Sequence, residues 1–435
     1  MIRSVLNAVK RNLKPIRSKT VTTSSNLPLQ VDAVVIGGGV IGCSILYQLS
    51  KRGVRVLLVE RGKLTCGTTF HTAGLVWSLR HSQFEIEMLK RTKRVFSELG
   101  ADNCGWINNG SLFIAHSKEE LREFAVLSEL GKSLGVNSFI LSESEARELF
   151  PLLESKNFIG ALYSPDDGVV DPYLLCSALI KASRRLNGTV LENCSVKEIL
   201  FDQNEQGRKV RGVLTDIGSV EADCVINARG LWSNQSIMGK DTPLPFITMK
   251  HSYVVTDTIQ NLNKWPNIRD HDLSIYFRVQ GQSLIIGGYE SNPTVVNNVP
   301  NDFQFSLYEM DWTTFEPLMQ NAIKLCPTLE SVGIKSSICG PEAFSIDRKP
   351  IVGPDYHING LFHACAFSSN GMMLSGGVAE RVAHWVVNGM SSVDVGLYDL
   401  KRFDSEKAMD KAWIQQKCVE NYSNKSRSKQ TILKM

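Results

Sequence analysis

The stretch VDAVVIGGGVIGCSILYQLSKRGVRVLLVE, residues 31–60, decides the fold class of this chain. It opens with a short apolar run, which is typical of a buried parallel strand. A glycine-rich turn and a helical segment ending at Gly53 follow, and a second apolar run ends at Glu60. A strand, a helix and a strand within about thirty residues form a βαβ unit, which predicts a Rossmann-type α/β domain.

The glycines of this turn have the GxGxxG spacing, at Gly37, Gly39 and Gly42. The first makes the tight turn, the second lets the backbone approach a pyrophosphate, and the third allows close packing of helix and strand. The helix N-terminus offers free N–H groups to phosphates. Glu60 ends the second strand, where a carboxylate accepts hydrogen bonds from ribose hydroxyls. Together they predict dinucleotide binding, because a glycine-rich turn in an unrelated α/β protein would leave Glu60 unexplained.

Composition and charge narrow the class of protein. Hydrophobic residues make up 43% and charged residues 21% of the 435 residues, as in a globular protein with a real core. The net charge of +4 comes from residues 1–30; the rest has 42 basic and 44 acidic side chains, so we expect no nucleic acid partner. Every long apolar run is interrupted by glycine, which predicts a soluble body without membrane insertion. The ten scattered cysteines favour buried thiols over disulfides or a metal site.

Residues 1–30 have the character of a mitochondrial transit peptide. They contain six basic residues and no acidic one, and serine and threonine are frequent in their second half. Their apolar residues recur at spacings of three and four along one helical face, at Ile2, Val5, Leu6, Val9, Leu13 and Ile16. The alternative is a disordered basic tail.

The nucleotide domain is expected to be assembled from separated segments. A helix that opens at Asp171-Pro172 is followed by strand-like runs as far as Gly230, and the strand GLFHACAF, the turn SSNG and a helix come near residue 370. Residues 31–240 and 336–395 are therefore assigned to this domain. The β-branched and aromatic runs of residues 241–335 predict an antiparallel substrate-binding domain. Residues 396–435 are expected to form a loosely attached C-terminal tail. This organisation favours FAD over NAD.

The first segment, DAVVIGGGVIGCSILYQLSKRGVRVLLVERGKLTCGTTFHTAGLVWSLR, resembles the dimethylglycine and sarcosine dehydrogenase family of FAD-dependent amine oxidoreductases. The resemblance continues to about residue 420 through NNGSLFIA, YSPDDGVVDPYLLC, SYVVTD, RDHDLSIYFRVQG, GGYE, IKSSICGPEAFSIDRKPIVGP and GMML. It implies a D-amino-acid oxidase-like α/β fold, in which a discontinuous Rossmann-type FAD-binding domain accompanies an antiparallel β-rich substrate domain.

The most specific block of the resemblance is HTAGL, at residues 71–75. In the family its histidine is bonded covalently to the 8α-methyl carbon of FAD, and His71 matches it. Imidazole suits this role because it is a nucleophile that is neutral near pH 7; spacing alone would favour a packed or capping histidine. The expected cofactor-binding residues are Gly37, Gly39, Gly42, Glu60, His71, Gly230, Gly371 and Met372.

The resemblance also implies the catalytic residues. His251 and Tyr276 match the family's substrate-side histidine and tyrosine, which orient the amine and help to keep it unprotonated. Without the family, a histidine on a sheet face and a core aromatic would be preferred. Arg80 or Arg278 is a candidate for binding a substrate carboxylate, with a solvated charge as the alternative.

The implied reaction is oxidative demethylation of an N-methyl amino acid, with sarcosine giving glycine and formaldehyde by hydride transfer to the flavin. The resemblance further implies the mitochondrial matrix as location and electron-transferring flavoprotein as electron acceptor. Three alternatives stay open: dimethylglycine as substrate, an oxidase that uses oxygen, and a non-catalytic subunit like the pyruvate dehydrogenase phosphatase regulatory subunit, which lacks the flavin-linking block.

The sequence departs from the family pattern in three respects. The C-terminal folate-binding domains of the family do not follow. Arg229 and Asn370 stand where small residues are expected beside the flavin. An unpaired buried guanidinium is costly, so Arg229 is expected to weaken cofactor binding.

Overall fold

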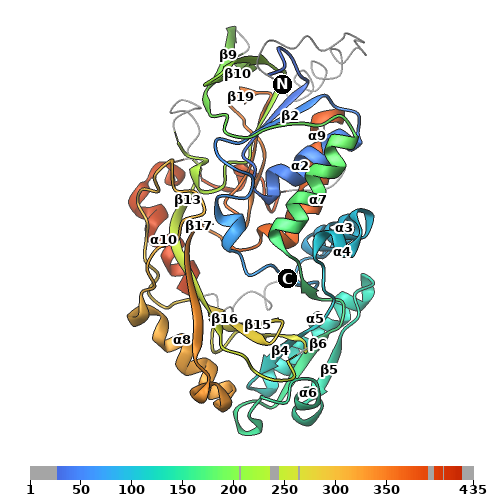
Figure 1. Ribbon diagram of the computed structural model, residues 1–435, viewed down its shortest axis with the longest axis vertical. Coiled ribbons are helices and arrows are strands. Elements are labelled where there is room, and N and C mark those ends of the chain that lie inside the picture. Colours follow the sequence, from blue (N-terminus) through green and yellow to red (C-terminus); the bar gives the residue numbers. More distant parts are fainter. Residues whose placement is uncertain are drawn as a thin grey trace.

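Two large sheets and the helices packed on them make up most of the computed structural model, which describes residues 27–204, 207–235, 244–262, 265–389, 396–404 and 406–423 (Figure 1). Residues 1–26 of the predicted transit peptide lie outside the described residues. The last residues assigned to that peptide belong to the body instead, because Leu27 is buried and Gln30 forms a β-bridge with Glu221.

The predicted βαβ unit forms the centre of a six-stranded sheet. Its two strands pair in parallel, with Ala33 opposite Val56 and Ile36 opposite Val59. The strand order is β18 (Ile351–Pro354), β20 (Leu361–Cys365), β12 (Cys224–Asn227), β1 (Ala33–Ile36), β2 (Val56–Val59) and β8 (Thr189–Leu191). Every neighbouring pair is parallel except β18–β20. The strands of this sheet therefore come from separated segments of the chain.

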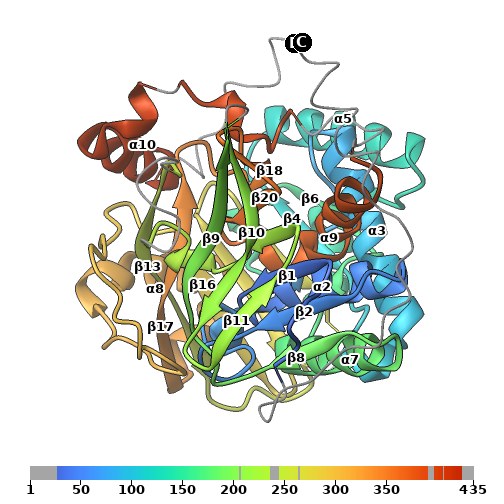
Figure 2. The same ribbon diagram turned by 90° about the horizontal axis from the view of Figure 1, so that it is seen from above.

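Both faces of this sheet are covered, so every residue of β1 is buried. The side chains of Ala33 and Val35 pack against helices on one face of the sheet. Those of Val34 and Ile36 pack on the other face, against a smaller four-stranded sheet. The helices on the first face are α2 (Val40–Lys51), α3 (Gln83–Leu99), α7 (Pro172–Arg185) and α9 (Gly371–Asn388). The second face is covered by a four-stranded sheet of β9 (Val196–Asn204), β10 (Gly207–Thr215), β11 (Gly218–Glu221) and β19 (Ile358–Asn359). Figure 2 shows β9, β10 and β11 over the six-stranded sheet, and Figure 1 labels β19.

The second large sheet has eight strands and is mostly antiparallel. Its order is β17 (Ile334–Ser345), β13 (Phe246–Thr256), β16 (Ser283–Gly288), β15 (Ile275–Gln280), β14 (Asn267–Asp270), β4 (Ser111–Ala115), β6 (Gly160–Ser164) and β5 (Phe139–Ser142). The predicted boundaries need correction here, because β4, β5 and β6 were assigned to the FAD-binding domain. They join the other sheet through a parallel pairing of β4 with β14. Likewise, β17 crosses the boundary predicted at residue 336.

The remaining helices pack around these sheets. They are α4 (Ala101–Cys104), α5 (Lys118–Ser133), α6 (Glu143–Leu149), α8 (Trp312–Leu325) and α10 (Lys411–Ser423), with short 3-10 helices at Thr68–His71, Ser155–Asn157, Gly230–Trp232, Pro327–Ser331, Leu400–Arg402 and Lys407–Met409. A small ribbon joins β3 (Leu75–Val76) to β7 (Gly168–Val169). The predicted start of α7 is confirmed, since the Asp171 side chain accepts a hydrogen bond from the N–H of Leu174. Within the described residues, no helix combines the length and apolar character that crossing a membrane requires.

The prediction of a loosely attached tail after residue 395 was wrong for the described part of that segment. Tyr398, Cys418 and Tyr422 are buried, and α10 packs against β13 and β17 (Figure 1). Arg402 also forms an ion pair with Asp347, with 2.8 Å between Nε and Oδ2. Counting basic residues missed these contacts because the buried side chains are spaced far apart among polar ones.

Candidate active site

Two of the three glycines in the turn after β1 are required by packing. Gly37 has φ of +112°, and a Cβ there would lie 2.5 Å from the carbonyl oxygen of Ala228. A Cβ on Gly42 would lie only 1.9 Å from the carbonyl oxygen of Gly37. Gly42 therefore holds α2 against the turn and does not itself line a cavity.

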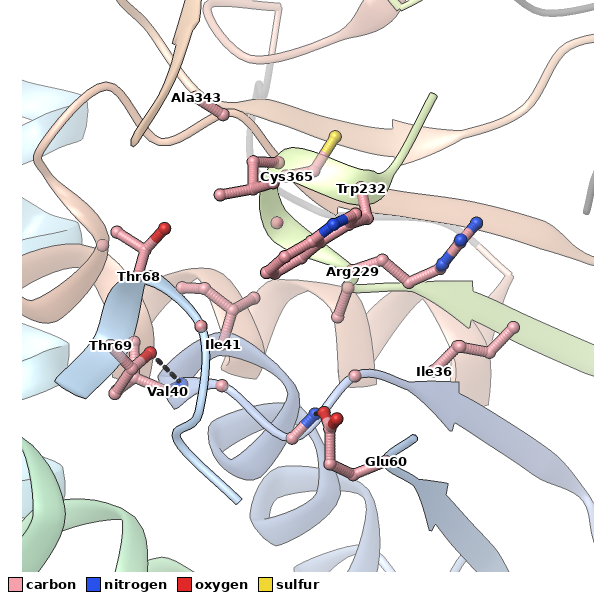
Figure 3. Close-up of a pocket in the computed structure, with 18 of the residues that line it drawn as sticks. Ile36, Val40, Ile41, Glu60, Thr68, Thr69, Arg229, Trp232, Ala343 and Cys365 are labelled. Atoms are coloured by element: carbon pink, nitrogen blue, oxygen red, sulfur yellow. Dashed lines mark hydrogen bonds between the residues drawn. The ribbon is translucent and has the colours of Figure 1, made fainter. Parts of the chain in front are cut away.

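The turn and the start of α2 form one wall of a cavity of about 630 Å³. Gly39 precedes the helix and provides no side-chain cap, so the first N–H groups of α2 face the cavity region. One of them, the N–H of Val40, donates to Oγ1 of Thr69 at 3.1 Å (Figure 3). A helix N-terminus beside a cavity of this size is suited to binding a phosphate group.

Glu60 lines the same cavity and is held by backbone groups. Its Oε2 accepts a hydrogen bond from the N–H of Gly38 at 2.6 Å, and its Oε1 accepts one from the N–H of Gly62 at 2.9 Å. These contacts fix the carboxylate at the end of β2 with its remaining lone pairs available as acceptors.

Trp232, with Arg61 stacked on it, forms another part of the wall. The guanidinium carbon of Arg61 lies 4.0 Å from the centroid of the Trp232 ring. Figure 3 shows Trp232 beside Arg229, with Glu60 near the glycine turn. Gly230 also lines the cavity, and a Cβ there would meet no atom within 4 Å.

Arg229 was expected to be an unpaired guanidinium, and that expectation was wrong. Its Nη1 donates to the carbonyl oxygen of Gln235 at 3.2 Å, and its Nη2 donates to Oε1 of the same residue at 3.3 Å. Burial lowers the pKa of Arg229 to about 10, which leaves the side chain charged at neutral pH. The cavity thus has a paired cation in its wall, which does not disfavour an anionic cofactor.

The start of α9 lies close to the start of α2, because a Cβ on Gly371 would be 3.9 Å from a side-chain carbon of Val40. Gly371 and Met372 line the large cavity. Asn370, the second departure from the family pattern, stabilises the preceding turn, because its Nδ2 donates to the carbonyl oxygens of Phe367 and Ser368 at 3.2 and 2.9 Å. Asparagine is suited to such a turn because its side chain bonds to nearby backbone.

A second, smaller cavity of about 50 Å³ brings together His71, His251, Tyr276 and Met372. Residues far apart in the sequence thus meet at one place. Four residues line both cavities: Thr72, Glu342, Ser369 and Met372. The two cavities are therefore neighbours, and a group bound in the large one can contact a small molecule in the other.

His71 is buried and neutral. It ends the 3-10 helix Thr68–His71 and is 5% exposed. Its ring rests against β17 at Gly340, where a Cβ would lie 2.4 Å from the ring. Burial lowers the pKa of His71 to about 4, and its buried Nε2 has no hydrogen-bond partner among the residues that the structure describes. A buried polar atom without a partner is costly unless a bound group contacts it.

His251 in β13 and Tyr276 in β15 lie on the two strands that flank β16 in the eight-stranded sheet. Nδ1 of His251 lies 2.9 Å from the hydroxyl of Tyr422, and its ring centroid is 6.4 Å from that of Tyr276. Burial is the main cause that raises the pKa of Tyr276 well above its ordinary value, so the phenol stays protonated.

Of the two arginines considered for a substrate carboxylate, neither lines the small cavity directly. Arg278 donates to the carbonyl oxygen of Ala73, in the loop after His71. Arg80 is half-buried and feels the charge of Arg269, which does line the cavity. Arg269 lies over the ring of Tyr289, with its guanidinium carbon 5.4 Å from the centroid.

Several lining residues escaped the sequence analysis. Glu342 lines both cavities, and its Oε2 accepts a hydrogen bond from Ser369 at 2.7 Å. Glu342 is a lone acidic residue among the mostly apolar residues at the end of β17, and this pattern could have indicated a site residue. The contributions of Thr69, Trp232 and Arg269 had no such signal, since each depends on contacts between distant segments.

The buried imidazole predicts a pH dependence of stability for the flavin-free protein. The unfolded chain takes up a proton at His71 below about pH 6.5, whereas the folded chain does so only below about pH 4. The free energy of unfolding should therefore fall as the pH drops from 6.5 to 4, and His71 should contribute about 3 kcal/mol to this fall. Urea unfolding of protein made under riboflavin limitation measures it, and His71→Gln should lose that part of the pH dependence. An identical pH dependence in the variant would contradict the burial of a neutral ring.

Comparisons with known proteins match most of the chain to a known family. The family described as FAD dependent oxidoreductase matches residues 32–385. The mitochondrial sarcosine dehydrogenase of Mus musculus is 42% identical over 407 residues, which is 92% of this chain and 44% of the relative. The mitochondrial pyruvate dehydrogenase phosphatase regulatory subunit of Mus musculus is 31% identical over 400 residues, 89% of this chain and 45% of the relative.

Among solved structures, the L-proline dehydrogenase from P. horikoshii is similar, with a TM-score of 0.77 and 26% identity. The match covers 87% of this chain and 98% of that protein. The predicted α/β fold with its parallel and antiparallel sheets is thereby confirmed. The chain spans 44% of the length of the sarcosine dehydrogenase that it matches.

Proposed function

Because this chain belongs to the FAD-dependent oxidoreductase family that matches residues 32–385, we propose that it oxidises an N-methyl amino acid, most simply sarcosine. Loss of a hydride from the N-methyl group leaves an iminium, and water hydrolyses this iminium to glycine and formaldehyde. The single observation that carries the proposal is the meeting of His71, His251 and Tyr276 around one small cavity that adjoins a large one. The 42% identity to a sarcosine dehydrogenase supports the choice of substrate.

The residues of the large cavity fit FAD. The glycine turn and the N-terminus of α2 would hold the diphosphate, Glu60 the ribose hydroxyls, and the start of α9 the flavin end. When bound, FAD supplies an acceptor for two electrons in the form of a hydride. The partnerless Nε2 of neutral His71 supports a covalent bond between this residue and the 8α-methyl carbon of the flavin.

The side chains of the small cavity would prepare the substrate. His251 would accept the proton of the ammonium group, because only the neutral amine has a lone pair that assists loss of hydride. Tyr276 would orient the amine. Arg269, supported by the nearby charge of Arg80, would bind the carboxylate, whereas Arg278 holds the loop that follows His71.

Electron-transferring flavoprotein is the acceptor that we propose, in the mitochondrial matrix; the mitochondrial sarcosine dehydrogenase relative supports the organelle. An oxidase of the same fold would instead pass its electrons to oxygen. Stopped-flow reoxidation of the reduced protein distinguishes the two: slow reaction with oxygen and fast reaction with the flavoprotein would support the dehydrogenase.

An anaerobic titration tests the function itself. One equivalent of sarcosine per flavin should bleach the flavin absorbance of the holoprotein completely. One molecule of formaldehyde should form for each flavin that is reduced. Dimethylglycine, titrated in parallel, should reduce the flavin more slowly at equal concentration, because its second methyl group needs room in a cavity of about 50 Å³. A flavin that stays oxidised with both amines would overturn the proposal.

A non-catalytic regulatory role is the second candidate, favoured by the 31% identity to a phosphatase regulatory subunit. It predicts bound flavin that no amine reduces. The same titration therefore decides between the two candidates.

A further inference from the structure

A buried chain of polar side chains connects the C-terminal helix α10 to His251. The hydroxyl of Tyr422 lies 2.9 Å from Nδ1 of His251 and donates a hydrogen bond to Oε2 of Glu290. Exposure is 0% for Tyr422, 7% for His251 and 4% for Glu290. The three residues come from α10, β13 and the segment after β16, so the contact exists only in the complete fold.

The single proton of a tyrosine hydroxyl makes this chain directional. While Glu290 is ionised, the hydroxyl donates to the carboxylate, and its oxygen accepts the Nδ1–H of His251. The imidazole then carries its proton on Nδ1, and Nε2 is the nitrogen that can accept a proton. When Glu290 is protonated, its carboxyl group can donate to the tyrosine oxygen, and the hydroxyl can turn to donate to Nδ1. The ring proton then moves to Nε2, which no longer accepts one.

We propose that Tyr422 is a positioning residue that couples the protonation state of Glu290 to the tautomer of His251. The consequence for catalysis rests on the proposed function: the ring removes the proton of the substrate ammonium group only while Glu290 is ionised. The coupling itself is a property of the folded chain and holds whatever the substrate is.

Glu290 titrates in the range where such coupling matters. Burial, as the largest cause, raises the pKa of Glu290 to about 7, and the hydrogen bond from Tyr422 opposes this increase. The titratable groups that act on Glu290 or feel its charge are Tyr422 of α10, Tyr276 of β15, Cys339 and Glu342 of β17, and Asp311 at the start of α8. The acids Glu342 and Asp311 also raise the pKa of Glu290. A carboxyl group with a raised pKa is protonated below that value, so the Nδ1–H tautomer of His251 is favoured above about pH 7.

The helix is held in place by contacts that do not involve the hydroxyl of Tyr422. The Tyr422 ring lies 4.9 Å from Phe344 and 5.3 Å from Tyr289, between ring centroids. The thiol of Cys418 donates to the carbonyl oxygen of Phe344 at 3.2 Å. Tyr422→Phe therefore removes the hydroxyl and keeps the ring packing, whereas Cys418→Ala weakens the seating of α10 without touching His251.

The experiment measures the tautomer of His251 directly in the holoprotein. The protein is labelled with 15N-histidine, the His251 signals are identified by their loss in His251→Gln, and spectra are recorded from pH 6 to pH 8. The wild-type ring should change from the Nε2–H to the Nδ1–H form with a midpoint near pH 7. Tyr422→Phe and Glu290→Gln should lose this transition, and Cys418→Ala should keep it.

Flavin reduction by sarcosine provides the second measurement over the same pH range. The wild-type protein should show an inflection near pH 7 that contributes about a tenfold change in rate between pH 6 and pH 8, as expected for one ionisation. Loss of the inflection in Tyr422→Phe but not in Cys418→Ala supports the coupling.

Two results would overturn the coupling: an unchanged tautomer transition in Tyr422→Phe, or its loss in Cys418→Ala as well, which would reduce the effect to helix packing. If sarcosine fails to reduce the wild-type flavin, the proposed function fails, but the tautomer spectra still decide whether Tyr422 couples Glu290 to His251.

Discussion

His71→Ala is expected to release all flavin from acid-precipitated protein, whereas the wild-type pellet should retain it. The imidazole is the nucleophile that we propose for the covalent bond, and no other group in the described part of the chain bonds to its buried Nε2. The absorbance and fluorescence of pellet and supernatant after precipitation measure the effect. The variant should still bind FAD non-covalently, because the glycine turn and Glu60 are unchanged.

His81→Ala is the matched control for this experiment. This histidine lies ten residues further on and is exposed, so its removal should leave the flavin in the pellet. Flavin that leaves the wild-type protein completely on precipitation would show that no covalent bond exists. Flavin retained by His71→Ala would place the bond on another residue.

Gly42→Ala should destabilise the nucleotide domain much more than Gly53→Ala, although each substitution adds a single methyl group. The added Cβ would lie 1.9 Å from the carbonyl oxygen of Gly37, and no side chain can move to relieve a contact with backbone. Helix α2 must shift away from β1, so we expect a loss of about 3 kcal/mol or more in the free energy of unfolding. Urea unfolding and the ratio of flavin to protein measure the two effects.

Gly53→Ala separates packing from backbone strain. Gly53 has φ of +75° and open space around its Cβ position. This substitution should lower the free energy of unfolding by about 1 kcal/mol, because alanine is strained in a left-handed conformation. It should leave flavin binding intact. Equal losses in both variants would show that the close contact of Gly42 has no special effect.

The sequence predicted the nucleotide domain well because its first unit is local. The strand, turn and helix around Gly37 and Gly42 follow one another, and each residue type has a task within the same thirty residues. The position of Glu60 at the end of β2 follows from the same spacing. His71 was singled out only through its family, since a buried neutral histidine has no distinctive spacing of its own.

The parts that could not be predicted depend on pairings between distant segments. The parallel pairing of β4 with β14 joins Ser111 to Asn267, and no local pattern indicates which sheet such a strand will join. Tyr422 lies in a helix with a polar sequence, so its contact with His251 could not be anticipated. The pairing of Arg229 with Gln235 depends on how the chain turns after Gly230.

Strand β17 also limits how the site can open. It pairs with β13 from Ser345 to Ile334, with Gly340 opposite His251, and the same Gly340 contacts the ring of His71. Two residues further along, Glu342 lines both cavities. The β13–β17 ladder lies within one sheet and fixes His251 relative to Gly340, and the packing of the His71 ring on Gly340 joins the segment that carries His71 to that sheet. A hinge rotation between the two large sheets would separate His71 from Gly340, whereas movements of loops and side chains admit a substrate and keep the two histidines together.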